Sequence, residues 1–327
     1  MTYNPPYTIT EKTVTLIADI MELITKIAMS EKVEINPKLR RIYRIKTIQA
    51  SLAIENNSLS IDQVTAIVNG KRVLGPGQDI KEVQNAYEAY EILLTLDPYD
   101  INSLFTAHKI LMNDLTKEAG RFRNGNVGVF AGEQLVHMAP PAHLVPEQVK
   151  ALIQWVMSSE AHPLVKSCVF HYEFEFIHPF SDGNGRMGRM WQTLILYKWK
   201  KIFGWLPVES LIKERQDQYY EVLGICDKSA DSGKFIEFLL QAIYDTLCDL
   251  GQTEQVCVQV TEQVLKLLEA MENEPLSTSE LMERVGIKHR PTFRNNYLLP
   301  AMEKGMVEMT IPDKPNSSKQ KYIKTKS

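Results

Sequence analysis

The chain has 327 residues, of which 44% are hydrophobic and 24% are charged, and its net charge is −3. These values are ordinary for a globular protein of about two domains, and they exclude a disordered, collagen-like or fibrous coiled-coil chain. No apolar run approaches the ~20 residues that span a bilayer, and the first residues lack the basic and apolar segments of a signal peptide. The four cysteines form no CxxC pair, which argues against a zinc site or a disulfide framework. We therefore expect a cytoplasmic protein without a membrane partner.

Charge is distributed unevenly along the chain. Residues 276–327 carry ten basic and five acidic side chains, which leaves the rest of the chain at −8. Such an asymmetry indicates a separate C-terminal module. We expect N-terminal helices over residues 1–75, a helical core over 76–250, and a linker helix with a small domain over 251–327.

Most of the chain shows the apolar spacing of helices, beginning with an i, i+3, i+4, i+7 stripe over residues 15–29. Ser60 and Gln63 form a capping-box pattern, and Asp79 with Glu82 marks a further helix start. The other expected helices cover residues 38–56, 102–115, 146–159 and 163–176, a stretch from about 186, and two or three segments between 209 and 272.

Two regions have a different texture. Residues 120–141 read GRFRNGNVGVFAGEQLVHMAPP, and their glycines and short apolar pairs predict a β-hairpin. After residue 276, the pattern predicts a capped helix from Ser277 to Gly286, a second helix over 290–304, and two short strands. Helix, turn, helix and a two-stranded wing make a winged helix-turn-helix. The expected fold class is therefore mainly α.

The segment most informative about function runs from His178 to Arg189 and reads HPFSDGNGRMGR. Gly183 and Gly185 permit positive φ, so consecutive backbone N–H groups can converge on one point. A helix that starts here adds the positive end of its dipole, and Arg186 and Arg189 lie on one face of that helix. Together these features make a place for several phosphate oxygens.

Two side chains at this loop could do chemistry on a bound triphosphate. Asp182 can hold Mg²⁺, which binds triphosphates through few carboxylates. His178 titrates near neutrality and can act as a general base. Because base, acid, glycines and paired arginines rarely coincide within twelve residues, we interpret the segment as a nucleotide site.

These residues match the Fic family motif HPFx(D/E)GNGRxxR at every specified position, and the chain resembles Fic-domain protein adenylyltransferases over roughly 40–250. The resemblance implies a helical core with a β-hairpin flap. It implies transfer of AMP from ATP to a Ser, Thr or Tyr hydroxyl of a target protein, which His178 would deprotonate. Asp182 would bind Mg²⁺ between the α- and β-phosphates, and Arg189 would hold the γ-phosphate. The remaining nucleotide-binding residues would be Gly183, Asn184, Gly185, Arg186, Met187 and Gly188.

The resemblance extends to the hairpin, which would be the flap that binds a target segment by β-augmentation. The flap residues that would line the nucleotide are Leu135, Val136, His137 and Met138, although a plain hairpin fits the sequence as well. The residues that resemble the adenine-side helix of the family are Tyr219, Tyr220 and Asp227. Two adjacent tyrosines on a helix also fit one core and one surface residue.

Upstream, Ser51-Leu52-Ala53-Ile54-Glu55-Asn56 matches the inhibitory pattern (S/T)xxxE(G/N) of the family, in the N-terminal position of the class II arrangement. Glu55 would pair with Arg189 in a bidentate carboxylate–guanidinium contact, which is a strong interaction. It would then occupy the arginine that the γ-phosphate needs. In the alternative activity, de-AMPylation, Glu55 would position a water instead.

The C-terminal module resembles those of many bacterial Fic proteins. Its second helix begins with polar side chains, where a DNA reader places base contacts: His289, Arg290, Thr292, Arg294, Asn295 and Asn296. The lysines on or near the wing are Lys314, Lys319, Lys321 and Lys324. A DNA-binding regulator with a nucleotide-sensing core is therefore a further alternative, and so is a module for protein contact or homodimerisation.

Overall fold

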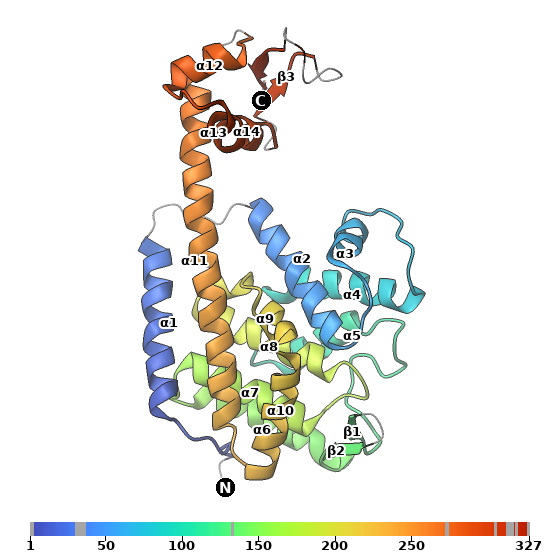
Figure 1. Ribbon diagram of the computed structural model, residues 1–327. Coiled ribbons are helices and arrows are strands. Elements are labelled where there is room, and N and C mark those ends of the chain that lie inside the picture. Colours follow the sequence, from blue (N-terminus) through green and yellow to red (C-terminus); the bar gives the residue numbers. More distant parts are fainter. Residues whose placement is uncertain are drawn as a thin grey trace. The chain divides into compact units, whose positions relative to one another are not determined.

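The computed structural model describes residues 3–29, 37–131, 134–271, 275–303, 306–311, 317 and 320–325. The chain forms two compact units, Met1–Cys248 and Asp249–Ser327. Both units are mainly helical, as the sequence predicts (Figure 1). Across the described ranges, no helix combines the length and the apolar composition needed to cross a membrane.

Helices make up most of the first unit, and nearly all of them match segments that the sequence predicts as helical. In chain order they are α1 (Glu11–Met29), α2 (Pro37–Ile54), α3 (Ile61–Val68), α4 (Gly77–Leu93), α5 (Ile101–Leu111), α6 (Val145–Ser158), α7 (Pro163–Ile177), α8 (Asn184–Trp199), α9 (Val208–Glu214), α10 (Gln216–Ser229) and the first part of α11 (Gly233–Ala270).

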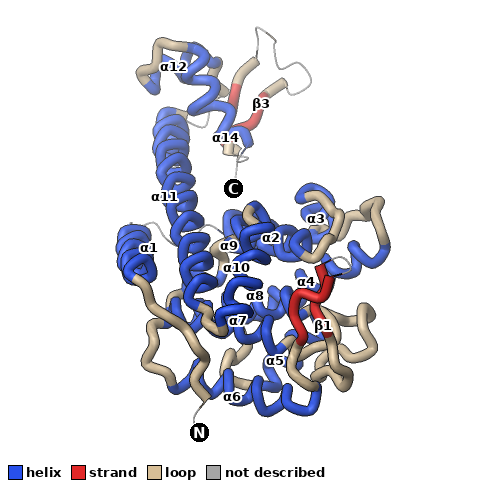
Figure 2. Tube along the Cα trace, turned by 60° about the horizontal axis from the view of Figure 1, so that its bottom comes forward, coloured by secondary structure: helices blue, strands red, loops and turns tan. Residues whose placement is uncertain are grey.

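Helices α7 and α8 form the centre of this unit, with α1 and the first part of α11 on one side and α2 to α5 on the other (Figures 1 and 2). Buried side chains surround both helices on most of their circumference, including Phe170, Phe174 and Trp191. A helix that is apolar on nearly every side is stable only inside a core. The loop that joins α7 to α8 is therefore held from both ends by buried helices.

Three helix starts differ by two residues or more from those predicted, and the first is that of α1, which begins at Glu11 instead of residue 15. Helix α4 begins at Gly77 rather than Asp79, because the Asp79 carboxylate accepts hydrogen bonds from the N–H and the hydroxyl of Ser58 at 2.8 and 2.5 Å. Helix α8 begins at Asn184, two residues before the predicted Arg186. The capping box at the start of α3 is confirmed.

The predicted hairpin is present as β1 (Gly128–Ala131) and β2 (Gln134–Met138), paired antiparallel with a bulge between Val129 and Phe130 (Figure 2). Met138 is 62% exposed. The side chains of Leu135, Val136 and His137 lie outside the described part of the structure.

The second unit follows the predicted order of helix, helix and two strands. Its elements are α12 (Thr278–Val285), α13 (Arg290–Phe293), a π-helical turn (Arg294–Leu298), α14 (Leu299–Glu303), β3 (Val307–Met309) and β4 (Tyr322–Lys324). Strands β3 and β4 are antiparallel, and the π turn interrupts the helix predicted over 290–304. The winged-helix assignment itself stays a prediction. Lys314 and Lys319 lie outside the described residues.

Candidate nucleotide site

The loop between α7 and α8 begins at His178, which ends α7 in the left-handed conformation with φ 49° and ψ 60°. The Nδ1 atom lies 3.3 Å from the carbonyl oxygen of Glu175. Because a carbonyl oxygen only accepts, this contact assigns the hydrogen of a neutral ring to Nδ1 and the lone pair to Nε2. The half-buried imidazole can therefore accept a proton at Nε2.

An aromatic stack anchors the turn that follows His178. Phe180 is fully buried, and its ring stacks on the imidazole of His108 with centroids 3.6 Å apart. The N–H of Gly120 donates to His108 Nδ1 at 2.9 Å, so Nε2 donates to the carbonyl of Asp182 at 3.0 Å. Burial lowers the pKa of His108 to about 4, which keeps this ring neutral and its tautomer fixed at physiological pH.

The two glycines at the start of α8 meet different requirements. Gly183 has φ 80°, which is the predicted positive value. Gly185 does not have positive φ, so that part of the prediction is wrong. A Cβ atom on Gly185 would instead lie 2.3 Å from Oε1 of Glu55. Gly185 therefore leaves a space beside the loop, and the Glu55 carboxylate occupies it.

Asn184 shapes the loop with its side chain. Its Oδ1 accepts from the N–H of Phe180 at 2.8 Å, and its Nδ2 donates to the carbonyl of Phe180 at 2.9 Å. Both ends of the amide are thus engaged, so a part in cradling phosphates falls to the backbone N–H. The N–H groups in the first turn of α8 have no intrahelical acceptor and carry the positive end of the helix dipole.

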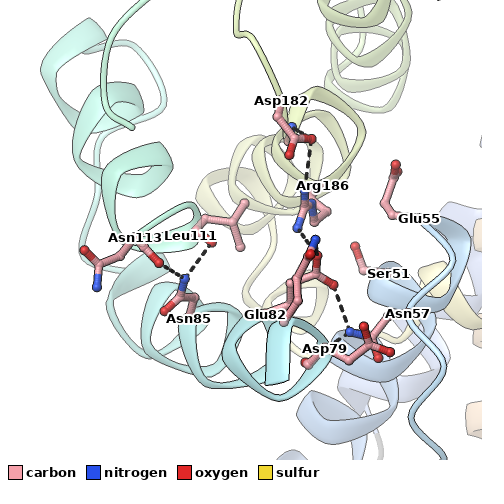
Figure 3. Close-up of polar contacts among 12 residues, drawn as sticks. Ser51, Glu55, Asn57, Asp79, Glu82, Asn85, Leu111, Asn113, Asp182 and Arg186 are labelled. Atoms are coloured by element: carbon pink, nitrogen blue, oxygen red, sulfur yellow. Dashed lines mark hydrogen bonds and ion pairs between the residues drawn. The ribbon is translucent and has the colours of Figure 1, made fainter. Parts of the chain in front are cut away.

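Arg186 is a buried cation between two carboxylates. Its Nη2 lies 3.2 Å from Oδ1 of Asp182 and its Nη1 lies 3.5 Å from Oε1 of Glu82. Glu82 in turn accepts from Nδ2 of Asn57 at 2.8 Å, and Figure 3 shows this line of contacts from Asp182 to Asn57. Within the described part of the chain, Nε and Nη1 of Arg186 are buried without a hydrogen-bond partner. Buried donors are normally paired, so these two fit a site that receives an anion.

Arg189 is bound by Ser51 of α2 and by Glu55, the residue that follows this helix. Its Nη2 donates to Oε1 of Glu55 at 2.7 Å and to the carbonyl of Ser51 at 3.0 Å, and its Nε donates to Oγ of Ser51 at 3.2 Å. The predicted contact between Glu55 and Arg189 is present, but the expected bidentate geometry is wrong. Only one carboxylate oxygen takes part, because Ser51 accepts the other hydrogen bonds. Burial disfavours the charged guanidinium, yet Glu55 and its neighbours outweigh this and raise the pKa of Arg189.

The segment predicted to be inhibitory ends in a turn, and the residue after this turn leads toward Arg186. Asn56 has φ 67°, a left-handed conformation that asparagine tolerates better than most residues. The next residue, Asn57, binds both Glu82 and the carbonyl of Asp79. The segment 51–57 therefore contacts Arg189 directly and reaches Arg186 through Glu82.

Asp182, the predicted Mg²⁺ ligand, has an accessible side chain in the loop. Its carboxylate is 58% exposed, and Oδ1 accepts from the N–H of Gly183 at 2.6 Å. The described residues contain no group of three or more His, Cys, Asp or Glu that could hold a metal by itself. Magnesium is commonly held by one or two carboxylates together with substrate phosphates. One exposed carboxylate beside a phosphate site therefore fits a metal that arrives with the nucleotide.

The predicted adenine-side residues do not share one environment. Tyr219 is buried, and its hydroxyl lies 3.1 Å from Nε2 of His171. Asp227 accepts a hydrogen bond from the hydroxyl of Tyr172 at 2.9 Å. Tyr220 is 47% exposed, so it is the most accessible of the three predicted residues. Their contact with adenine stays a prediction.

Met187 and Gly188 pack beneath the loop. Met187 is fully buried, and a Cβ atom on Gly188 would lie 3.0 Å from Oε1 of Glu175 and 3.1 Å from Cδ2 of His171. These two residues let α8 approach α7 closely. Their place among the predicted nucleotide residues therefore rests on packing rather than on side-chain contact with a ligand.

Three side chains at the site were not singled out from the sequence as functional: Glu82, His108 and Arg123. In the sequence, Glu82 is only a signal for a helix start, whereas in the structure it is one of the buried residues of α4. A histidine on the apolar face of the predicted helix 102–115 was the available signal for His108. Arg123 belongs to the GRFRN segment, which the sequence marks as the approach to the flap.

Comparison with known proteins identifies the family. The Fic/DOC family matches residues 98–196, and the Filamentation induced by cAMP protein Fic-like C-terminal domain matches residues 262–325. The crystal structure of a Fic family protein from Desulfovibrio desulfuricans G20 is 51% identical, covers 99% of both chains and superposes with a TM-score of 0.77. The chain therefore belongs to the Fic family.

More distant relatives include proteins named as enzymes. Protein adenylyltransferase Fic of Nematostella vectensis is 30% identical over 212 residues, which are 61% of this chain and 47% of the relative. A probable protein adenylyltransferase of Aquifex aeolicus is 30% identical over 153 residues, 45% of each protein. The chain spans about half the length of the curated relatives it matches. The Fic-1 fragment 134–508 from C. elegans shares the fold, with 21% identity, 74% and 73% coverage and a TM-score of 0.61.

Proposed function

We propose that this protein transfers AMP from ATP to a Ser, Thr or Tyr hydroxyl of a target protein, and that Glu55 inhibits the transfer. The observation that carries the proposal is the candidate anion site at the start of α8, where Nε and Nη1 of Arg186 are buried without a hydrogen-bond acceptor among the described residues, although Nη1 lies 3.5 Å from Glu82. A histidine with its lone pair on Nε2 stands at the beginning of the same loop. The names of the curated relatives support the same reaction.

The chemistry follows from these groups. A bond forms between the target hydroxyl oxygen and the α-phosphorus, and the bond from that phosphorus to the oxygen bridging to the β-phosphate breaks. The hydroxyl proton passes to Nε2 of His178, and pyrophosphate leaves. Arg186 and the first-turn N–H groups of α8 stabilise the negative charge of the phosphates. Mg²⁺ held by Asp182 would supply further neutralising charge on the α- and β-phosphates.

Inhibition by Glu55 would act on both space and charge. The carboxylate fills the space that Gly185 leaves, and it binds Arg189. The cation that a γ-phosphate needs is therefore already paired. Without Glu55, Arg189 would keep only the neutral acceptors of Ser51. A buried charge without a counter-ion is unfavourable, so the release of Glu55 would be favoured by a replacement anion such as the γ-phosphate.

The proposal is tested with a lysate, labelled ATP and a Glu55→Gly variant. Mass spectrometry should find adenylate on serine, threonine or tyrosine of a target protein. The control is the Glu55→Gly/His178→Ala double variant, which should bind ATP normally but lose ~10²–10⁴ in transfer rate, the usual contribution of a general base. Undiminished transfer by the double variant would contradict the role of His178. No adenylate on any protein, with ATP bound, would contradict AMP transfer.

The position of Glu55 also fits the second activity predicted from the sequence, de-AMPylation. Its side chain is 32% exposed and lies beside the loop, where a carboxylate can orient a water toward a phosphorus atom. Target protein adenylated by the Glu55→Gly variant should then lose its label when wild-type protein is added, with release of AMP. A label that stays constant would rule out this activity.

We propose further that residues 276–327 bind DNA weakly. All six polar residues predicted for DNA contact are exposed. His289 caps α13, Arg290 and Thr292 lie in it, and Arg294, Asn295 and Asn296 lie in the π-helical turn that follows. His289 and Thr292 bind each other at 2.8 Å. This leaves Arg290, Arg294, Asn295 and Asn296 for contacts, with Lys321 and Lys324 exposed near the strands. A cytoplasmic location and a homodimer stay predictions.

A further inference from the structure

A buried cation connects the flap to the catalytic loop. Arg123 is 3% exposed, and no carboxylate of the described residues pairs with it. Its own N–H donates to the carbonyl of Pro179 at 3.0 Å. Its guanidinium donates to four main-chain carbonyl oxygens: Nε to His178 at 2.7 Å, Nη1 to Gly125 at 2.8 Å, and Nη2 to Pro140 at 2.5 Å and to Ile177 at 3.3 Å.

These acceptors belong to segments that are distant in the sequence. Gly125 and Pro140 flank the β1–β2 hairpin, whereas residues 177–179 join α7 to the catalytic loop. The guanidinium group has five N–H donors in a rigid planar fork, which the compact ammonium group of lysine lacks. One side chain thus fixes the base of the flap and the backbone of His178 to the same point.

The backbone of His178 needs such a hold. Its left-handed conformation is unfavourable for a residue with a Cβ atom, and it persists only where surrounding contacts determine it. Of the two guanidinium hydrogen bonds to carbonyls of the α7–loop junction, the one from Nε to His178 is the shorter, at 2.7 Å against 3.3 Å for Ile177. Without the guanidinium of Arg123, the backbone turn at His178 that orients the imidazole would be less restrained.

We propose that Arg123 is a positioning residue, which aligns the base His178 with a hydroxyl presented on the flap. The inference rests on the proposed AMP transfer, in which the flap binds the target segment. A target strand paired to the flap then arrives at a set distance from Nε2 of His178. Among the described residues, the carbonyls that accept from Arg123 are not contacted by Arg186 or Arg189, which bind Glu82, Asp182, Ser51 and Glu55. The phosphate contacts of these two arginines should therefore not depend on Arg123.

The test is an Arg123→Lys substitution in the Glu55→Gly background, which keeps the charge and removes the fork. Three quantities are measured: transfer of α-labelled adenylate to the chain's own hydroxyls, affinity for ATP, and the NMR signal of the His178 ring in histidine-labelled protein. Transfer should fall ~10–100-fold, because small displacements of reacting groups have effects of this size. ATP affinity should stay unchanged, and the His178 signal, assigned by its loss in His178→Ala, should shift or broaden.

The matched control is Arg121→Lys. Arg121 is exposed and donates to the carbonyl of Lys117, so this variant should equal its parent in all three measurements. Arg123→Gln, which keeps a planar donor group, is the second variant. Its transfer rate and His178 signal should change in the same direction as in Arg123→Lys, with ATP affinity retained.

Two results would overturn the inference. One is a normal transfer rate with an unchanged His178 signal in Arg123→Lys. The other is loss of ATP binding in both Arg123 variants, because the residue would then support the fold as a whole. The NMR signal does not depend on the reaction, so the two proposals can fail separately. Undiminished transfer by His178→Ala would refute the base in the proposed function, whereas a shifted ring signal would still report the tie to Arg123.

Discussion

Two helix starts in this protein carry a pair of arginines, and their environments are opposite. At α8, the side chains of Arg186 and Arg189 are 6% and 1% exposed, and each has a carboxylate within 3.5 Å. Arg290 of α13 and Arg294 of the π-helical turn after it are exposed, and neither forms an ion pair with a described residue. Buried charges interact strongly and are screened little by salt, whereas exposed charges are screened within about 10 Å at 0.1 M salt.

The difference shows what each pair can do. The buried pair contacts individual partners at fixed positions, so in the proposed inhibition the carboxylate of Glu55, one residue after the end of α2, decides whether Arg189 is available. The exposed pair can contribute only through the summed field of its neighbourhood, because single exposed ion pairs are worth ~0–1 kcal/mol. We therefore expect large and salt-insensitive effects at α8, and small, salt-sensitive effects at α13.

The largest effect on AMP transfer should come from removing Glu55, the proposed inhibitory partner of Arg189. Glu55→Gly should raise AMP transfer and self-labelling, because Arg189 becomes available to the γ-phosphate. The gain should disappear in Glu55→Gly/Arg189→Ala, since loss of one group that stabilises charge typically lowers kcat by ~10²–10³. Initial rates with labelled ATP, at low and high salt, measure both variants. If the single variant is no faster than wild type with the same target, Glu55 is not the brake.

A second prediction concerns the pH dependence of stability, for which two histidines are compared. His108 packs on the α7–α8 loop, and His289 caps α13. Burial lowers the pKa of His108 to about 4 in the folded state, so the unfolded chain binds more protons between pH 6.5 and 4. Stability from this group is therefore fully present above pH 6.5 and is lost as pH falls toward 4. At about 1.4 kcal/mol per pH unit, the loss approaches ~3 kcal/mol.

The measurement is the free energy of unfolding at pH 7 and pH 5. A His108→Asn variant should be less stable at pH 7 but should lose less stability on acidification than wild type. The exposed His289→Asn variant should keep the wild-type dependence. His171, with a pKa near 3, adds to the acid loss, and Glu209, with a pKa raised by burial to about 7, opposes it. His171 and Glu209 are present in the wild type and in both variants, so their contributions cancel in the comparison. An equal loss of unfolding free energy between pH 7 and pH 5 in His108→Asn and wild type would contradict the prediction.

The smallest effect should come from the exposed pair. The Arg290→Ala/Arg294→Ala variant should weaken DNA binding by the full chain and leave AMP transfer unchanged. The log of the binding constant should fall with the log of salt concentration by about 0.9 per phosphate contact, and the variant should show a shallower slope. Gel-shift titrations on mixed-sequence duplex measure this. No shift at low salt would favour a protein partner for this unit instead.

Much of the fold could be predicted because its signals are local. Apolar spacing predicts the helices, and both the Ser60–Gln63 capping box and the capped helix between Ser277 and Gly286 are formed. A predicted helix start is wrong where the side chain expected to cap the helix binds a residue that is distant in the sequence. The clearest case is Asp79, whose carboxylate binds Ser58 instead of capping α4. A pattern within one helix cannot reveal that competition.

The sequence by itself determined the chemistry of the loop, because the residues from His178 to Arg189 are contiguous and their types restrict what they can bind. The pairing of Glu55 with Arg189 could be expected only through the resemblance to a family, because 134 residues separate them. Tertiary structure alone decided the roles of Glu82, His108 and Arg123. Arg123 and His108 bind main-chain groups, which every residue possesses, so no pattern of residue types encodes these contacts. They exist only because the folded chain brings the flap, α5 and the α7–α8 loop to one place.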